Sequence, residues 1–203
     1  MTLAELLASR TARIADVRDL LVPMDFAARR AALHALDRKG QRALYAVAAQ
    51  ADAITLADLV PANRADLTEV RHHGRNTLPV LPTFRTFEKR FCRPAGSTDK
   101  LFGYNQGTSE RWFGPGYFVA YVVTGNPVWA AHGDVVVDYF QVPDGPVAET
   151  WPAVVPNEQG LQRFVFAGTR DFLRKVVDGV SIGAAYKGER ALDHYFVLVR
   201  DDR

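Results

Sequence analysis

The chain contains 203 residues, of which 48% are hydrophobic and 24% are charged, and its formal net charge is +2. These values are typical of a globular chain with one domain or two small ones, long enough to bury a core without disulfide bonds. Because basic and acidic residues are balanced in both halves of the sequence, we expect no general binding of nucleic acid.

Cysteine usage and the N-terminal composition bear on the location of the protein. Cys92 is the single cysteine, which excludes an intrachain disulfide and is typical of a reducing compartment. Charged residues from Glu5 to Asp19 leave no apolar segment of the kind found in a secretory signal. We therefore expect a cytoplasmic protein.

The first 76 residues carry the signals of successive helices. Thr2 with Glu5 and Thr55 with Asp58 have the spacing of capping boxes, and Gly40 is a typical residue after a helix end. Apolar residues recur three and four positions apart between these signals. Helices are expected over residues 3–22, 26–39, 41–50, 56–60 and 65–73.

The character of the sequence changes after these helices, beginning with a proline-containing linker over residues 77–82. Residues 83–93 fit two structures. Three phenylalanines spaced three and four residues apart favour a short helix, whereas a strand would place Phe87, Lys89 and Phe91 on one side. We favour the helix, and we expect its basic residues to form an anion-binding wall or a solvated face.

Residues 112–133 contain no charged residue, the longest such interval in the sequence. The aromatic and β-branched run over residues 117–124 predicts a strand, a Gly-Asn-Pro turn follows, and residues 128–131 are expected to return as a second strand. A membrane-spanning helix is excluded because two clusters of proline and glycine would interrupt it.

The uncharged strand has side chains that alternate between two apolar faces. We expect Phe118 and Val122 on one face and Tyr117, Val119 and Tyr121 on the other, all largely buried. A sheet that contains such a strand must be covered on both sides or must enclose something.

The C-terminal part predicts further strands and one helix. Strands are expected over residues 101–105, 134–142, 164–166, 181–186 and 192–200, and a helix over residues 169–179. In the second of these strands Val135, Val137 and Tyr139 share a face, while Asp138 lies among apolar residues on the other face. A buried carboxylate needs an arginine or hydroxyl partner, or it takes part in chemistry.

Together these elements predict an α+β protein, in which an N-terminal helical layer precedes a largely antiparallel, aromatic-rich sheet or partly closed barrel of about five to seven strands. Residues 1–76 would form the helical region and residues 77–203 an antiparallel β-rich domain with one or two helices, unless the two parts form one continuous domain. The helical layer would cover one side of the sheet and leave the other side for a ligand cavity.

The leading functional hypothesis is a small-molecule binding site on the sheet. Aromatic walls with a few directional polar groups and a basic rim would favour an apolar ligand that carries an acidic group. The candidate residues are Arg90, Arg93, Tyr104, Trp112, Tyr117, Tyr121 and Asp138, with the two arginines at the mouth and the aspartate inside. The alternative is a solid core in which these aromatic residues pack on the helical layer.

Two other classes of function are compatible with the sequence. His132, Asp134 and His194 have the composition of a 2-His-1-carboxylate iron(II) site in a mononuclear metal enzyme. A turn between two strands explains the first two of these residues equally well. The N-terminal helices would instead serve as a protein-interaction module, for example in a homodimer.

Familiar catalytic motifs do not fit their context. Residues 179–183 match G-x-S-x-G, but the nucleophile elbow needs a strand before the serine and a helix after it, and the reverse is expected here. No G-x-G-x-x-G or Walker A sequence occurs. The sequence therefore resembles no family closely enough to assign a reaction.

Overall fold

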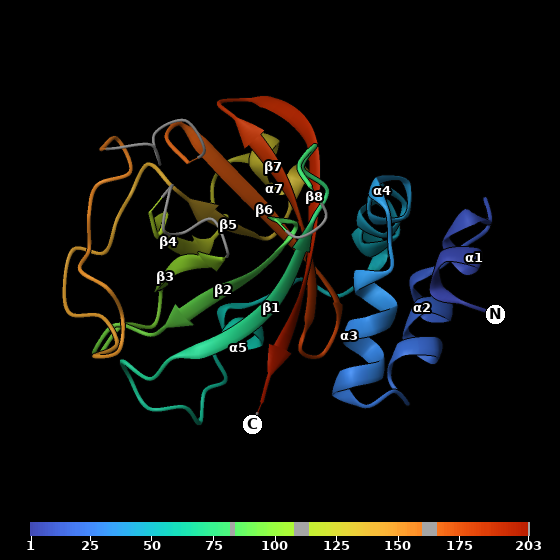
Figure 1. The fold of residues 1–203 in the computed structure, drawn as a ribbon, viewed down its shortest axis with the longest axis horizontal. Coiled ribbons are helices and arrows are strands. Elements are labelled where there is room, and N and C mark those ends of the chain that lie inside the picture. The colour runs from blue at the N-terminus through green and yellow to red at the C-terminus, as the bar shows by residue number, and fades with distance from the viewer. Residues whose placement is uncertain (82–83, 108–113, 160–165, 203) are drawn as a thin grey trace.

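Eight antiparallel strands form a closed barrel (Figure 1). The computed structural model describes residues 1–81, 84–107, 114–159 and 166–202, and the strands lie within these ranges. They are β1 (Val70–Asn76), β2 (Thr86–Cys92), β3 (Lys100–Gly107), β4 (Tyr117–Val122), β5 (Val135–Asp138), β6 (Thr169–Val177), β7 (Val180–Lys187) and β8 (Arg190–Asp201). Each strand pairs with the next along the chain, and β8 pairs with β1 to complete the ring.

Closure of the ring divides the side chains of each strand between an interior and an outer face. In the interior, His72 of β1 lies opposite Lys89 of β2 on one side and opposite Arg200 of β8 on the other. The structure confirms the mixed helix and strand content and the antiparallel sheet. The ring contains more strands than the roughly five to seven expected.

Short helices precede the barrel, and one more lies between β4 and β5. They are α1 (Leu3–Ala8), α2 (Ile14–Leu21), α3 (Phe26–His34), α4 (Arg38–Val47), the 3-10 turn η1 (Ala48–Gln50), α5 (Leu56–Leu59) and α7 (Pro127–His132). The two predicted capping boxes are present at the starts of α1 and α5. Gly40 does not end a helix, because its N–H donates to Asp37 Oδ1 in the first turn of α4. No helix in the described ranges has the length and apolar character needed to cross a bilayer.

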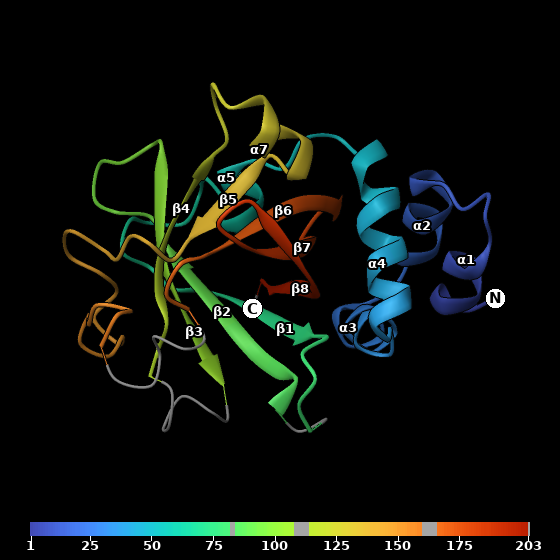
Figure 2. The same cartoon turned by 90° about the horizontal axis from the view of Figure 1, so that it is seen from above.

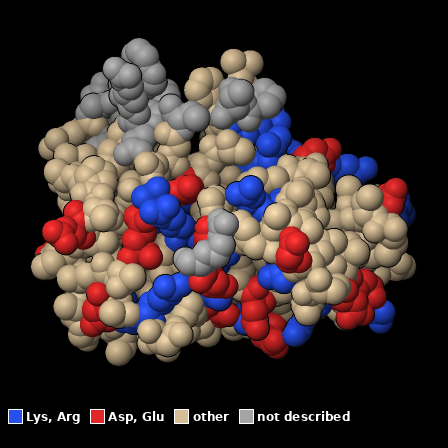
Figure 3. All heavy atoms as spheres, turned by 60° about the horizontal axis from the view of Figure 1, so that its bottom comes forward, with Lys and Arg blue, Asp and Glu red and all other residues tan. Residues whose placement is uncertain are grey.

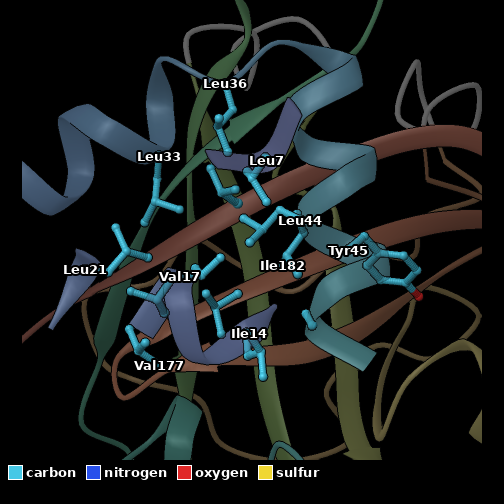
Figure 4. Packing of buried hydrophobic residues seen from close by; sticks show 14 of the residues in the cluster. Leu7, Ile14, Val17, Leu21, Leu33, Leu36, Leu44, Tyr45, Val177 and Ile182 are labelled. Atoms are coloured by element: carbon cyan, nitrogen blue, oxygen red, sulfur yellow. The ribbon is translucent and has the colours of Figure 1, made fainter. Parts of the chain in front are cut away.

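Helices α2, α3 and α4 pack on the outer face of β6, β7 and β8, and α1 packs against α2 and α4 on the side away from the barrel (Figures 1 and 2). Figure 4 shows Val17, Leu21 and Leu33 of the helices clustered with Val177 and Ile182 of the strands. The three helical side chains are fully buried. The helical layer therefore turns apolar side chains toward the strands and covers one side of the sheet, as expected.

A second apolar cluster fills one end of the barrel interior. Ile54, Leu59 and Val60, which belong to α5 and its flanking residues, pack with Phe91 and Leu101 inside the ring. These side chains are all at most 2% exposed. The end of the barrel next to α5 is therefore a packed core.

The predicted helix over residues 83–93 is wrong, because most of this segment forms β2. The observed alternation is that of the second interpretation, with Phe87, Lys89 and Phe91 on the interior side. Phe84 lies before the strand begins, so the helix-like spacing of the phenylalanines crosses an element boundary.

Several other segments differ from their predicted structure, among them residues 9–13, which separate α1 from α2 within the single helix expected over residues 3–22. Residues 169–179 contain β6 instead of a helix. The strand is buried on both faces, so its apolar residues do not alternate and their spacing resembles that of a helix. Residues 128–131 lie in α7, where the side chain of Asn126 caps the helix and Pro127 occupies its first position. The helix predicted over residues 65–73 is absent, and β1 begins within this range at Val70.

The other predicted strands correspond to β3, β4, β5, β7 and β8. Of the predicted strand over residues 164–166, only Phe166 lies among the described residues, and it belongs to a turn. In β4 the predicted alternation is confirmed, since Phe118 packs in the interior cluster and Tyr117 in a cluster on the outer face. Val122 is 41% exposed, so the expectation that it is buried is wrong.

The outer face of β4 offers a test of this arrangement. Val119 is 4% exposed and belongs to the cluster around Trp151, whereas Val122 on the same strand is 41% exposed. Val119→Asp would bury an unpaired carboxylate and should lower the free energy of unfolding by at least about 3 kcal/mol. Val122→Asp should cost about 1 kcal/mol or less. Chemical denaturation followed by circular dichroism compares the two variants, and equal losses would contradict the burial of this face.

A buried histidine links α5 to the barrel. His72 is 1% exposed, and its Nε2–H donates to the Leu59 carbonyl at 2.9 Å. Burial lowers the pKa of His72 from 6.5 to about 4, outweighing the opposite effect of this hydrogen bond. The folded protein therefore holds this ring in its neutral form at neutral pH.

The pKa of His72 predicts a loss of stability in acid. Between pH 6.5 and about pH 4 the unfolded chain binds a proton at this residue while the folded chain does not, so stability falls as the pH decreases through this window. Below both pKa values, this effect of His72 lowers the free energy of unfolding by about 3 kcal/mol relative to neutral pH. Denaturation curves at a series of pH values should show this slope, and His72→Gln should flatten it. A variant with the full slope would assign the acid sensitivity to other groups.

Candidate functional site

A cavity of about 420 Å³ occupies the end of the barrel opposite the packed core. Most of its lining is apolar, with aromatic rings contributed by Phe84, Phe87, Phe166 and Phe196. The lining extends to Phe84, which is 43% exposed, so the cavity reaches the molecular surface on this side. Its volume lies in the range of sites that bind small molecules.

Pairs of glycine and phenylalanine shape the walls of this cavity. Gly74 of β1 lies opposite Phe87 of β2, and Gly183 of β7 lies opposite Phe196 of β8. A Cβ atom on Gly74 would lie only 2.5 Å from the Phe87 ring, and one on Gly183 would collide with the Phe196 ring. Glycine therefore allows each ring to lie close against the neighbouring strand.

A buried polar cluster forms the inner end of the cavity. Lys89 is 1% exposed, and its Nζ donates to Tyr139 Oη at 2.6 Å and to Asp171 Oδ2 at 3.2 Å. The Tyr139 hydroxyl donates to the same carboxylate oxygen at 3.2 Å, and Asn105 Nδ2 donates to Tyr139 Oη at 2.8 Å. We call Lys89, Asn105, Tyr139 and Asp171 the inner cluster, to which β2, β3, β6 and the residue after β5 each contribute one side chain.

Burial changes the proton affinities of the inner cluster. The Nζ atom of Lys89 lies 4.7 Å from the ring centroid of Phe118 and 5.0 Å from that of Phe196. Burial lowers the pKa of Lys89, although Asp171 acts in the opposite direction. Burial likewise raises the pKa of Asp171 against the effect of Lys89, and it raises that of Tyr139 well above its ordinary value. The ionised forms of Lys89 and Asp171 are therefore less favourable inside the barrel than they are in water.

Two of the aromatic residues predicted to line a pocket lie on the outer face of the barrel. Tyr104 and Tyr117 pack against Trp151, with ring centroids 5.0 Å and 6.3 Å from the tryptophan. Asn157 fixes this segment by donating to the Tyr117 carbonyl at 2.6 Å. The predicted Trp112 lies outside the described residues.

The two predicted arginines are paired with protein groups. Arg90 forms ion pairs with Glu69 at 2.9 Å and with Glu88 at 2.6 Å. Arg93 donates to the carbonyl oxygen of Arg64 at 2.9 Å, and also to two further carbonyls of the segment after α5. On the face shown in Figure 3, charged side chains of both signs are interspersed. The guanidinium groups of Arg90 and Arg93 are therefore occupied by interactions within the chain.

Asp138 is partnered, but not by either of the predicted arginines. Its carboxylate lies 3.2 Å from Arg170 Nε, and it accepts hydrogen bonds from Tyr121 Oη at 3.0 Å and from Gln141 Nε2 at 3.1 Å. None of the predicted pocket residues in the described part of the chain lines the cavity. The structure brings Tyr104 together with Tyr117, and Tyr121 together with Asp138. The role of the predicted residues in binding stays a prediction.

The three predicted metal ligands do not converge. His132 stacks on Tyr186 at a centroid distance of 4.3 Å, and Asp134 accepts a hydrogen bond from the Ile54 N–H at 3.2 Å. His194 lines the cavity. Within the described ranges, no three His, Cys, Asp or Glu side chains are arranged so that they could hold a metal ion.

Lys89 is the member of the inner cluster that the sequence singles out, as one of the basic residues expected to form an anion-binding wall or a solvated face. The solvated face is wrong for Lys89, which is 1% exposed, and as a strand residue it lies on one face with Phe87 and Phe91. Tyr139 was placed on the correct face with Val135 and Val137, since all three belong to the interior cluster. The helix expected over residues 169–179 gives no indication that Asp171 lies within hydrogen-bonding distance of Lys89.

The chain matches no protein-family model, no curated protein and no solved structure. The interpretation of the cavity therefore depends on its own geometry and chemistry.

Removing one charge of the inner cluster should leave the other buried without a partner. Lys89→Met and Asp171→Asn should each lower the free energy of unfolding by about 3–5 kcal/mol. The double variant should lose clearly less than the sum of these two effects, because no unpaired charge remains. Urea denaturation measures this cycle, and additive losses would contradict an interaction between the two residues.

An exposed ion pair provides the control for this cycle. Lys100 Nζ lies 3.0 Å from Asp144 Oδ1, but the two side chains are 33% and 71% exposed. Lys100→Met and Asp144→Asn should each change the free energy of unfolding by less than about 1 kcal/mol.

Proposed function

We propose that this protein binds an apolar small molecule in the barrel cavity, with the polar end of the ligand at the inner cluster. The observation that carries this proposal is the combination of an apolar cavity of about 420 Å³ with a buried ion pair at its inner end. Such a combination of apolar walls and a few convergent polar groups is typical of ligand sites, and eight-stranded barrels are wide enough to hold one small ligand.

The apolar lining supplies most of the binding free energy in this proposal. Rings from β2 and β8 and side chains such as Leu78 and Leu192 surround the space, so a hydrocarbon portion of the ligand would leave water on binding. The inner cluster would orient the ligand, because Tyr139 and Asn105 combine a hydroxyl and an amide at one place.

The charge balance of the inner cluster bears on the polar group of the ligand. Asp171 already compensates the charge of Lys89, at a distance of 3.2 Å. The cavity therefore favours a neutral polar group, such as a hydroxyl or a carbonyl, over a second carboxylate next to Asp171. The preference for an acidic ligand that was expected from the sequence stays a prediction, to be compared directly with a neutral ligand.

Fluorescence titration with N-phenyl-1-naphthylamine, a neutral apolar dye, tests the proposal. The wild-type protein should bind the dye, and Ala185→Trp should weaken binding at least about tenfold, because residue 185 lines the cavity and the indole would fill it. Ala191→Trp is the matched control, since this alanine is exposed on the neighbouring strand and does not line the cavity. Equal dye binding by both variants would overturn the proposal.

Displacement of the dye distinguishes the two kinds of polar group. Decanol and decanoate have the same chain length but differ in charge. We expect decanol to displace the dye at a lower concentration than decanoate does. The reverse order would restore the preference for an acidic ligand.

A further inference from the structure

We propose that Lys89 forms a covalent imine with an apolar aldehyde that enters the barrel cavity. This inference rests on the proposed function and specifies the class of ligand and the atom that it meets. The candidate atom is Lys89 Nζ, which lies at the inner end of an apolar cavity between the rings of Phe118, Tyr139 and Phe196. An aldehyde whose hydrocarbon chain occupied the cavity would place its carbonyl group at this end.

The environment of Lys89 favours a nucleophilic amine. An ammonium group does not attack a carbonyl carbon, so a lysine that forms an imine must lose a proton first. At 1% exposure Lys89 lacks the hydration that stabilises an ammonium ion, and burial lowers its pKa. Asp171 Oδ2, at 3.2 Å, is positioned to accept the proton.

Lys175, which has two carboxylate partners, shows how exposure to solvent changes the proton affinity of a paired lysine. Lys175 lies 2.7 Å from Asp58 and 2.8 Å from Asp178, but its side chain is 21% exposed. Burial lowers the pKa of Lys175 only in part, and the hydrogen bonds with the two carboxylates raise it above its ordinary value. Of these two lysines, Lys89 therefore combines an acidic partner with the desolvation needed for a reactive amine.

The reaction needs no group beyond the aldehyde and the inner cluster. The proton of Lys89 Nζ passes to Asp171, the freed lone pair forms a bond to the carbonyl carbon, and the carbonyl π electrons move to the oxygen. Two of the three ammonium protons leave with that oxygen as water, relayed by the Asp171 carboxylate. The third proton remains on the nitrogen as its lone pair forms the carbon–nitrogen double bond, and nothing is oxidised or reduced.

The product retains the charge balance of the inner cluster. A protonated imine carries one positive charge, as the ammonium group did, and it would lie beside the restored Asp171 carboxylate. Tyr139, which donates to Asp171 Oδ2 at 3.2 Å, and Asn105, which donates to Tyr139, hold this carboxylate and hydroxyl in place. The same buried ion pair therefore supplies both the proton relay and the counter-ion of the imine.

Trapping with decanal tests the inference. The wild-type protein is incubated with decanal and sodium cyanoborohydride, which reduces a protonated imine to a stable secondary amine much faster than it reduces a free aldehyde. Intact mass should increase by the mass of decanal, less one water, plus two hydrogens, and peptide mapping should place the adduct on Lys89. The remaining lysines are internal controls for surface modification: Lys39, Lys100, Lys175 and Lys187.

Two variants accompany the trapping experiment. The double variant Lys89→Met with Asp171→Asn should lose the mapped adduct without leaving an unpaired buried charge, and Lys100→Arg should form the adduct to the wild-type extent. If the double variant does not fold, the peptide map of the wild-type protein still decides the question. Modification spread evenly over the five lysines, or no adduct on Lys89, would overturn the inference.

Decanol separates failure of this inference from failure of the proposed function. Decanol fits the same space but has no carbonyl carbon. If decanol and decanal both displace N-phenyl-1-naphthylamine while Lys89 stays unmodified, the cavity binds apolar molecules and the imine is excluded. If neither compound displaces the dye and no adduct forms on Lys89, both proposals are overturned.

Discussion

Pairing of β8 with β1 is the constraint on which the rest of this structure depends. Without that pairing the sheet would have two open edges and no defined interior. With it, alternate side chains of each strand face an enclosed space, and residues distant in the sequence meet there. Lys89 and Asp171 are separated by 82 positions, yet they form a hydrogen-bonded ion pair inside the ring. The candidate site is therefore a product of closure and not of any single segment.

The enclosed space is used differently at its two ends. Next to α5, side chains such as Leu59 and Phe91 fill the interior, and His72 joins this core by a hydrogen bond to a helix carbonyl. At the other end, phenylalanine rings lie against glycines such as Gly74 and leave a cavity between the walls. The packed end stabilises the fold, whereas the hollow end leaves apolar side chains of the cavity wall without close packing partners. This difference is the structural reason to look for a ligand at the hollow end.

The outer face of the barrel explains why the most conspicuous residues of the sequence are not in the cavity. The helical layer covers β6 to β8, and the segment that carries Trp151 covers the outer sides of Tyr104 and Tyr117. Both covers bury large apolar and aromatic side chains, so the strands are apolar outside as well as inside. The cluster of Arg90 with Glu69 and Glu88 lies beside the second cover. Aromatic and basic character alone does not distinguish such a cover from a ligand site.

Local signals in the sequence determined much of the secondary structure. The capping boxes set the starts of α1 and α5, the three-four spacing of apolar residues predicted the helical layer, and the uncharged run predicted β4. These features act within a few residues along the chain, where caps and turns are energetically decisive. Periodicity was misleading in β6, because burial on both faces removes the alternation that identifies a strand.

The candidate site was decided by the tertiary structure. The sequence shows Lys89 between two phenylalanines, and the strand interpretation of residues 83–93 places all three on one face. It does not show the partners of Lys89, because residues 169–179 have the spacing of a helix and the meeting of β2 with β6 across the interior depends on the closure of the ring. A residue pattern determines which side chains share a face of one strand. Which faces enclose a common space, and whether that space is filled or hollow, follows only from the packing of all eight strands.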